Sequence, residues 1–61
     1  MPEVIVYAVE GRSTEQKRGL VKDITDAVTR NFGVAAEQVV VQIVESSTSS
    51  KARGGVLFSD R

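Results

Sequence analysis

The sequence contains no cysteine and no histidine, and these two absences remove several kinds of chemistry. Without them the chain can form no disulfide, no Cys- or His-liganded zinc site and no catalytic centre based on either residue. The 61 residues form one domain, residues 1–61. A domain this small buries only about 60% of the surface that its unfolded chain exposes, so partner subunits commonly supply the missing stability. We therefore expect an oligomer.

The sequence also lacks an excess of charge of one sign and a long apolar run. Eight basic residues balance eight acidic ones, so a polyanion-binding surface is not indicated and we expect no nucleic-acid partner. No apolar run approaches the roughly 20 residues that span a bilayer, and the N-terminus lacks the signal-peptide pattern. We expect a cytoplasmic protein with no membrane partner.

Two β-branched runs, residues 4–9 and 39–44, flank a helical pattern over residues 14–32. Ser13 and Gln16 are spaced as a capping box before it, and Gly33 is placed to end it. Apolar residues recur at helical spacing at Leu20, Val21, Ile24, Ala27, Val28 and Phe32, with Lys17, Lys22, Asp26 and Arg30 predicted on the opposite side. The order predicts a small βαβ subunit of the α/β (α+β) class with two parallel strands.

The C-terminal third predicts little regular structure. Residues 46–50 form a serine-rich stretch that we interpret as an exposed loop. Gly54 and Gly55 mark a turn before the apolar residues 56–58, which could form a short hairpin-like segment or lie across a neighbouring subunit. Residues 59–61 are expected to fray.

A single helix covers only one face of a two-stranded sheet, although both faces of the predicted strands are apolar. Two strands alone are also marginal in water. We infer a homo-oligomer in which sheets pair edge to edge and stack face to face.

Catalytic options are few, and the first is Pro2, which begins the first predicted strand directly after Met1. Removal of the initiator methionine would leave a secondary amine, and chain-terminal amines titrate near about 8. An apolar pocket or a nearby guanidinium disfavours the charged form, and a neutral amine is a competent general base or nucleophile. The alternative is that Pro2 merely begins an edge strand.

Arg12 is the second candidate, because it follows the first strand and precedes the helix. Its guanidinium could hold a carboxylate bidentately, and the adjacent helix N-terminus also attracts anions. The alternative is an arginine in a solvated loop.

Together these features resemble the 4-oxalocrotonate tautomerase family. The resemblance is carried by Pro2 at the start of a strand, the segment EGRSTEQK at residues 10–17, the amphipathic helix, the valine-rich strand ending at Glu45 and the glycine pair at 54–55. It extends over nearly the whole chain without a gap.

The resemblance implies a βαβ subunit in a hexamer built as a trimer of dimers, and a cofactor-independent isomerase that uses no metal. Pro2 would be the general base that moves a proton within a small enolic or unsaturated 2-oxo acid. Arg12 would bind a carboxylate of this anionic substrate.

Two positions depart from the family pattern. Val40 stands where characterised members carry a second arginine, and Lys51 stands where they place an aromatic residue. Lys51 or Arg53 could supply a replacement cation for substrate binding, the alternative being two solvated loop charges.

These departures leave two rival hypotheses open. The chain could be a non-catalytic or weakly active subunit of a hetero-hexamer with a tautomerase paralogue. It could also use Pro2 as a nucleophile, or to activate water for hydration or decarboxylation, with Glu3 or Glu10 as an additional acid.

Overall fold

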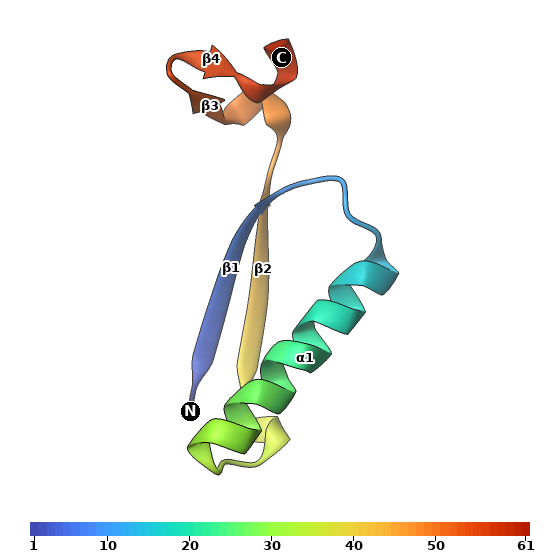
Figure 1. The fold of residues 1–61 in the computed structure, drawn as a ribbon, viewed down its shortest axis with the longest axis vertical. Coiled ribbons are helices and arrows are strands. Elements are labelled where there is room, and N and C mark those ends of the chain that lie inside the picture. The colour runs from blue at the N-terminus through green and yellow to red at the C-terminus, as the bar shows by residue number, and fades with distance from the viewer.

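Two parallel strands with one helix crossing them form the body of the chain in the computed structural model, which describes residues 1–61 (Figure 1). Strand β1 spans Glu3–Val9, helix α1 spans Thr14–Phe32 and strand β2 spans Val40–Ser46. The strands pair in register from Glu3 opposite Val40 to Val9 opposite Ser46. The predicted βαβ order is confirmed, with β1 starting one residue earlier than expected and β2 displaced toward the C-terminus.

Helix α1 has the predicted bounds because both of its ends are capped. Ser13 Oγ accepts the backbone N–H of Gln16 at 3.1 Å, and Gln16 Oε1 accepts the N–H of Ser13 at 2.9 Å. Such a cap contributes about 1 kcal/mol to helix stability. At the other end, Gly33 adopts the left-handed conformation with φ of 67° and its N–H donates to the carbonyl of Thr29.

One position on the predicted polar side of this helix was assigned wrongly. Lys17 lies three residues before Leu20, which places it at the N-terminal end of the apolar stripe, and its Nζ pairs with Glu45 of β2 at 2.8 Å. Lys22 remains on the exposed side, where its hydrogen bond to Asp26 raises the pKa of Lys22 above its usual value.

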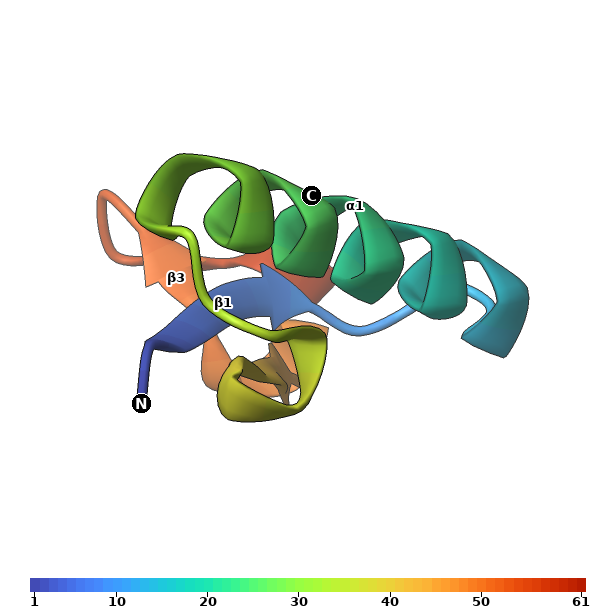
Figure 2. The same ribbon diagram turned by 90° about the horizontal axis from the view of Figure 1, so that it is seen from below.

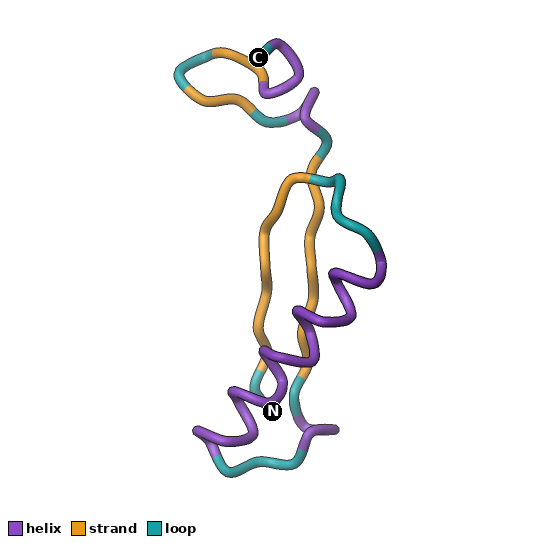
Figure 3. The backbone as a smooth tube through the Cα atoms, turned by 45° about the vertical axis from the view of Figure 1, so that its right-hand side comes forward, coloured by secondary structure: helices purple, strands orange, loops and turns teal.

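The chain after β2 forms a separate hairpin arm, residues 47–61, that extends beyond the end of the sheet (Figure 3). Its short elements are the 3₁₀ helix η2 (Thr48–Ser50), strands β3 (Ala52–Arg53) and β4 (Val56–Leu57), and the 3₁₀ helix η3 (Phe58–Asp60); a further turn, η1 (Ala36–Gln38), lies between α1 and β2. The arm is connected mainly to itself, because its principal contacts join β3 to β4, η2 to β4 and η2 to η3.

Two expectations for this arm need correction, whereas the glycine turn is confirmed. The serine-rich stretch is partly regular, because Ser46 ends β2 and Ser47 caps η2 through the N–H of Ser49. The C-terminal residues expected to fray form η3 instead, and Arg61 donates to the carbonyl of Arg53 at 2.9 Å. Residues 54–55 both have positive φ, which only glycine adopts readily in a two-residue hairpin turn.

No residue of the isolated chain is fully buried. Figure 2 shows α1 on one side of the sheet only, and the uncovered face of β1 leaves Tyr7 74% exposed and Ile5 46% exposed. Phe32, predicted on the apolar side of the helix, is 69% exposed. The apolar residues therefore define faces that need a partner and do not form a closed core.

The dimensions of the chain also indicate that it does not form a closed, compact core by itself. Its radius of gyration is 14.7 Å, against about 10.5 Å for a compact chain of this length. Its accessible surface is 4626 Å², against about 3,900 Å² for a folded monomer of this mass. No helix combines the length and apolar character needed to cross a membrane.

We expect the fold to depend on protein concentration, because association must bury the faces that the single chain leaves exposed. The apparent melting temperature should fall as the protein is diluted from about 100 to 1 μM, as followed by circular dichroism with native mass measured in parallel. Tyr7→Glu should lower both melting temperature and native mass, whereas Arg18→Gln, at an exposed position of α1 without a hydrogen bond or ion pair, should change neither. A monomer that melts at one temperature across this range would contradict the expectation.

Candidate functional site

A cavity of about 230 Å³ lies between the sheet and the first half of α1. Five of its nine lining residues are apolar and four are polar or charged, a mixture that is common in small-molecule sites. The lining comes from β1 (Val6, Ala8, Val9), the β1–α1 connection (Arg12), α1 (Gln16, Lys17, Leu20) and β2 (Ile43, Glu45).

Arg12 reaches this cavity from a connection that is fixed at both ends. Before it, the N–H of Glu10 donates to the carbonyl of Ser46 at 2.9 Å, and Gly11 turns the chain with φ of 126°, a conformation that L side chains rarely adopt. After it, Ser13 is held in the capping box. The guanidinium itself makes no hydrogen bond or ion pair in the structure, so its donors are available to a ligand.

Lys17 and Glu45 form the second polar feature of the cavity. Their 2.8 Å ion pair joins α1 to β2, and each side chain is about 30% exposed. Because the pair neutralises itself, Arg12 is the one unpaired charge on the cavity wall. A small molecule with one carboxylate and an apolar body would match this lining.

Pro2 does not line the cavity and lies at the opposite end of β1 from Arg12. The strand between them spans about 20 Å at 3.3 Å per residue. The carbonyl of Pro2 accepts the N–H of Val40 at 3.0 Å, which places the side chain of an apolar residue beside the strand start. A single chain therefore does not bring these two predicted site residues together.

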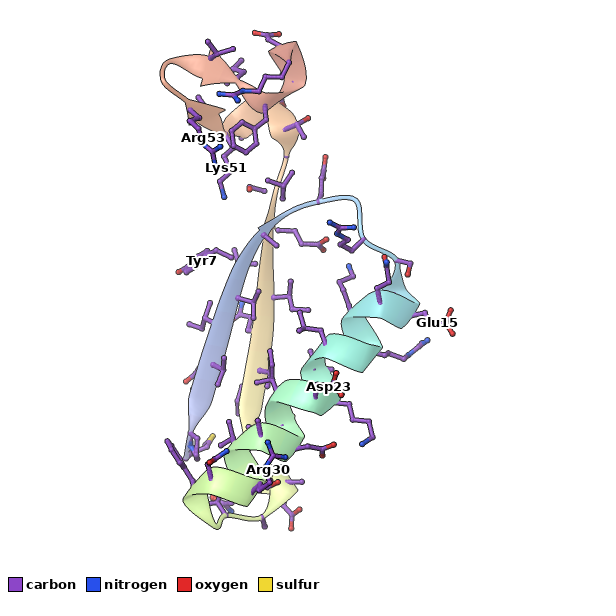
Figure 4. The ribbon with its side chains drawn as sticks, in the orientation of Figure 1. Tyr7, Glu15, Asp23, Arg30, Lys51 and Arg53 are labelled. Atoms are coloured by element: carbon purple, nitrogen blue, oxygen red, sulfur yellow. The ribbon has the colours of Figure 1, made fainter.

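Lys51 and Arg53 lie on the hairpin arm beyond the end of the sheet (Figure 4), and neither lines the cavity that contains Arg12. Arg53 stacks over the ring of Phe58 with its guanidinium carbon 5.7 Å from the centroid, and Arg61 lies over the same ring at 5.3 Å. The carbonyl of Lys51 accepts the N–H of Phe58 at 2.8 Å. The ring of Phe58 therefore brings Arg53 and Arg61 together within the arm, and no residue of the arm lines the cavity.

Sequence reasoning missed Lys17, Glu45 and Gln16 as cavity residues. The signal was present in the spacing, because Lys17 precedes Leu20 by three residues and Glu45 follows Ile43 by two. Helical and strand periodicity therefore place each on the same face as an apolar neighbour that lines the cavity.

A family model described as "Tautomerase enzyme" matches residues 2–61. A probable tautomerase of Bradyrhizobium diazoefficiens is 48% identical over 61 residues, which cover all of this chain and 91% of the relative. The 2-hydroxymuconate tautomerase of Bacillus subtilis is 43% identical over 60 residues, or 98% of this chain and 97% of the relative.

Solved structures share the same fold along the whole chain. The crystal structure of a 4-oxalocrotonate tautomerase homologue superposes with a TM-score of 0.95 at 41% identity and covers 100% of this chain and 97% of its own. A heterohexamer 4-oxalocrotonate tautomerase of Chloroflexus aurantiacus superposes with a TM-score of 0.86 at 30% identity, covering 98% and 97% respectively.

We expect the free guanidinium of Arg12 to dominate binding of small carboxylates. A hydrogen bond to a charged group contributes about 1.5–3 kcal/mol, so Arg12→Gln should weaken binding of benzoate at least about tenfold, measured by titration with NMR detection. Arg18→Gln removes a helix arginine that does not line the cavity and should leave the affinity unchanged. Equal affinities of the two variants would contradict this assignment.

Proposed function

This chain belongs to the tautomerase family and is an isomerase resembling 4-oxalocrotonate tautomerase, and we propose that Pro2, once Met1 is removed, is its general base. The substrate is a small enolic or unsaturated 2-oxo acid that undergoes a 1,3- or 1,5-proton shift. The observation that carries the proposal is the unpaired guanidinium of Arg12 in an apolar cavity, which fits the anionic end of such a molecule.

The chemistry needs one base and no net change in atoms or charge. The neutral amine of Pro2 takes the hydroxyl proton of the enol, and the electron pair left on oxygen forms the carbonyl as the conjugated double bonds shift. The resulting ammonium then returns the proton to carbon. An apolar surrounding and a nearby guanidinium both keep the amine uncharged near neutrality, which makes it ready for the first transfer.

In this proposal the complete site is shared between chains. Pro2 and Arg12 lie at opposite ends of β1, and each strand of the two-stranded sheet has one unpaired edge. A two-fold symmetric, antiparallel pairing of two sheets sets the Arg12 end of one chain beside the Pro2 end of its partner. Each dimer then carries two identical sites.

Further association of dimers would cover the uncovered sheet face that carries Ile5 and Tyr7. We propose the hexamer, a trimer of dimers, as the assembly that buries this face and gives the hairpin arm a neighbour to contact. The arm carries exposed apolar side chains at Val56 and Leu57, which support docking on another subunit.

A second cation is also proposed to come from the arm. Val40 beside Pro2 is uncharged, so the base has no basic residue on the paired strand. Lys51 or Arg53 of a neighbouring arm would stabilise the oxyanion that develops when the enol loses its proton, a contribution of about 3 kcal/mol in comparable sites.

The alternative function is that of a non-catalytic or weakly active subunit in a mixed hexamer with a tautomerase paralogue. The absence of a cation at Val40 favours it, and one structural relative is a heterohexamer. Co-purification with a second tautomerase-like chain, and turnover only in its presence, would favour this alternative over the homo-oligomeric enzyme.

Replacing the base should reduce turnover without disturbing assembly. General acid–base catalysis contributes about 10²–10⁴-fold, so Pro2→Ala should lower kcat/KM for ketonisation of 2-hydroxymuconate and of phenylenolpyruvate by at least about a hundredfold. Intact-mass analysis of each preparation establishes the fraction that lacks Met1, and activity should scale with that fraction. Equal rates for Pro2→Ala and the Met1-free parent would remove Pro2 from the mechanism.

A mixing experiment tests whether the site is shared. Pro2→Ala and Arg12→Gln chains, each nearly inactive alone, are unfolded together and refolded in equal amounts. If one chain supplies the base and another the anchor, random assembly leaves about a quarter of the sites intact, and about that fraction of activity returns. Native mass controls for refolding, and mixed material that stays inactive would place both residues within one chain's site.

A further inference from the structure

Three charged side chains line the cavity, and only two of them pair with each other. Lys17 Nζ and Glu45 Oε1 are 2.8 Å apart, whereas Arg12 has no partner. Lys17 and Arg12 are also the only cations on the wall, and Glu45 is the only anion. One carboxylate therefore shares the wall with two cations, and only Lys17 is paired to it.

The geometry points to Lys17 as a positioning residue that occupies Glu45 and so keeps Arg12 open to the substrate's carboxylate. This inference rests on the proposed role of Arg12 as the carboxylate anchor. It assigns to the ion pair a part in substrate affinity, beyond any part in holding the fold together.

Glu45 is the carboxylate for which the two cations of the cavity wall can compete. Glu45 stands on the cavity wall with its side chain 29% exposed, and Lys17 is the cation that pairs with it. If Lys17 were uncharged, Arg12 would be the one cation left on the same wall. A guanidinium binds a carboxylate in a bidentate manner, so the new pair would compete directly with the substrate's own carboxylate.

The positions of the two cations explain why Glu45 pairs with Lys17 and not with Arg12. Lys17 projects from the apolar stripe of α1 toward β2, and strand alternation places Glu45 on the helix-facing side together with Ile43. Arg12 is held in a separate connection, fixed by the Glu10 bond to β2 and by the capping box of α1. The lysine is thus anchored on the element that packs over Glu45.

The Lys17–Glu45 ion pair could serve only to join α1 to β2, or it could keep Arg12 free. These two roles predict different KM values for the single variants. If the pair only joined the helix to the sheet, removing either partner would cause similar losses, because each change leaves the other charge unpaired. Removing both relieves that charge in either case, so the KM of Glu45→Gln is the readout that separates the two roles. If the pair protects Arg12, loss of Lys17 alone is harmful, loss of Glu45 alone is harmless, and loss of both is nearly neutral.

The experiment compares KM and kcat for phenylenolpyruvate in the assembled protein and in Lys17→Gln, Glu45→Gln, the double variant and Lys17→Arg. Lys17→Gln should raise KM about fivefold or more, because an unpaired carboxylate then competes for Arg12, with kcat within about twofold of the parent. Glu45→Gln should have a KM equal to or below the parent's. The double variant and Lys17→Arg should return to within about twofold of the parent KM.

Melting temperature and native mass are measured for every variant to separate affinity from assembly. A double variant as impaired as Lys17→Gln, or an Glu45→Gln variant whose KM rises equally, would overturn the inference. If Lys17→Gln fails to assemble, the KM of Glu45→Gln alone decides, because an increase contradicts the inference and no increase supports it.

Arg12→Gln in the same series distinguishes this inference from the function on which it rests. If Arg12→Gln leaves KM unchanged, the carboxylate anchor itself is wrong, and the role of Lys17 falls with it. If Arg12→Gln raises KM but Lys17→Gln does not, only the role of Lys17 is wrong and the proposed isomerase keeps its anchor.

Discussion

The rest of this structure depends on one constraint: a chain of 61 residues that folds as strand, helix and strand cannot enclose its own apolar side chains. The helix covers one face of the sheet, and no residue reaches full burial. Each element is well formed locally, with both helix ends capped and the strands paired in register over their full length. The stability that local structure does not supply must come from contacts between chains.

The same constraint shapes the site. The residues proposed as base and anchor lie at opposite ends of one strand, and the proposed second cation lies on an arm that projects beyond the sheet. What the single chain holds by itself is the cavity with the proposed anchor, because Arg12 lies in a connection fixed at both ends and Lys17 is paired to Glu45. The proposed carboxylate anchor therefore lies within one chain, whereas the proposed base and second cation are supplied to it by the assembly.

Much of the fold could be predicted from the sequence because its signals are local. Ser13, Gln16 and Gly33 set the ends of α1, and the paired glycines at 54–55 set the hairpin turn. The pairing of Lys17 with Glu45 was missed because it joins residues 28 positions apart, and neither helical nor strand periodicity states which partner a charged side chain will choose. The structure of the serine-rich segment was missed for a related reason, since Ser47 forms its cap through a local bond that composition does not reveal.

The separation of Pro2 from Arg12 along β1 also has a consequence for how such genes diverge. If the site is shared between chains as proposed, and a gene of this kind is duplicated so that the two products co-assemble, one copy can lose its proline and the other its arginine while the mixed particle retains a fraction of working centres. Neither copy can then be deleted without loss of activity. Because the strand keeps the two functional groups about 20 Å apart, two redundant paralogues would then depend on each other for activity.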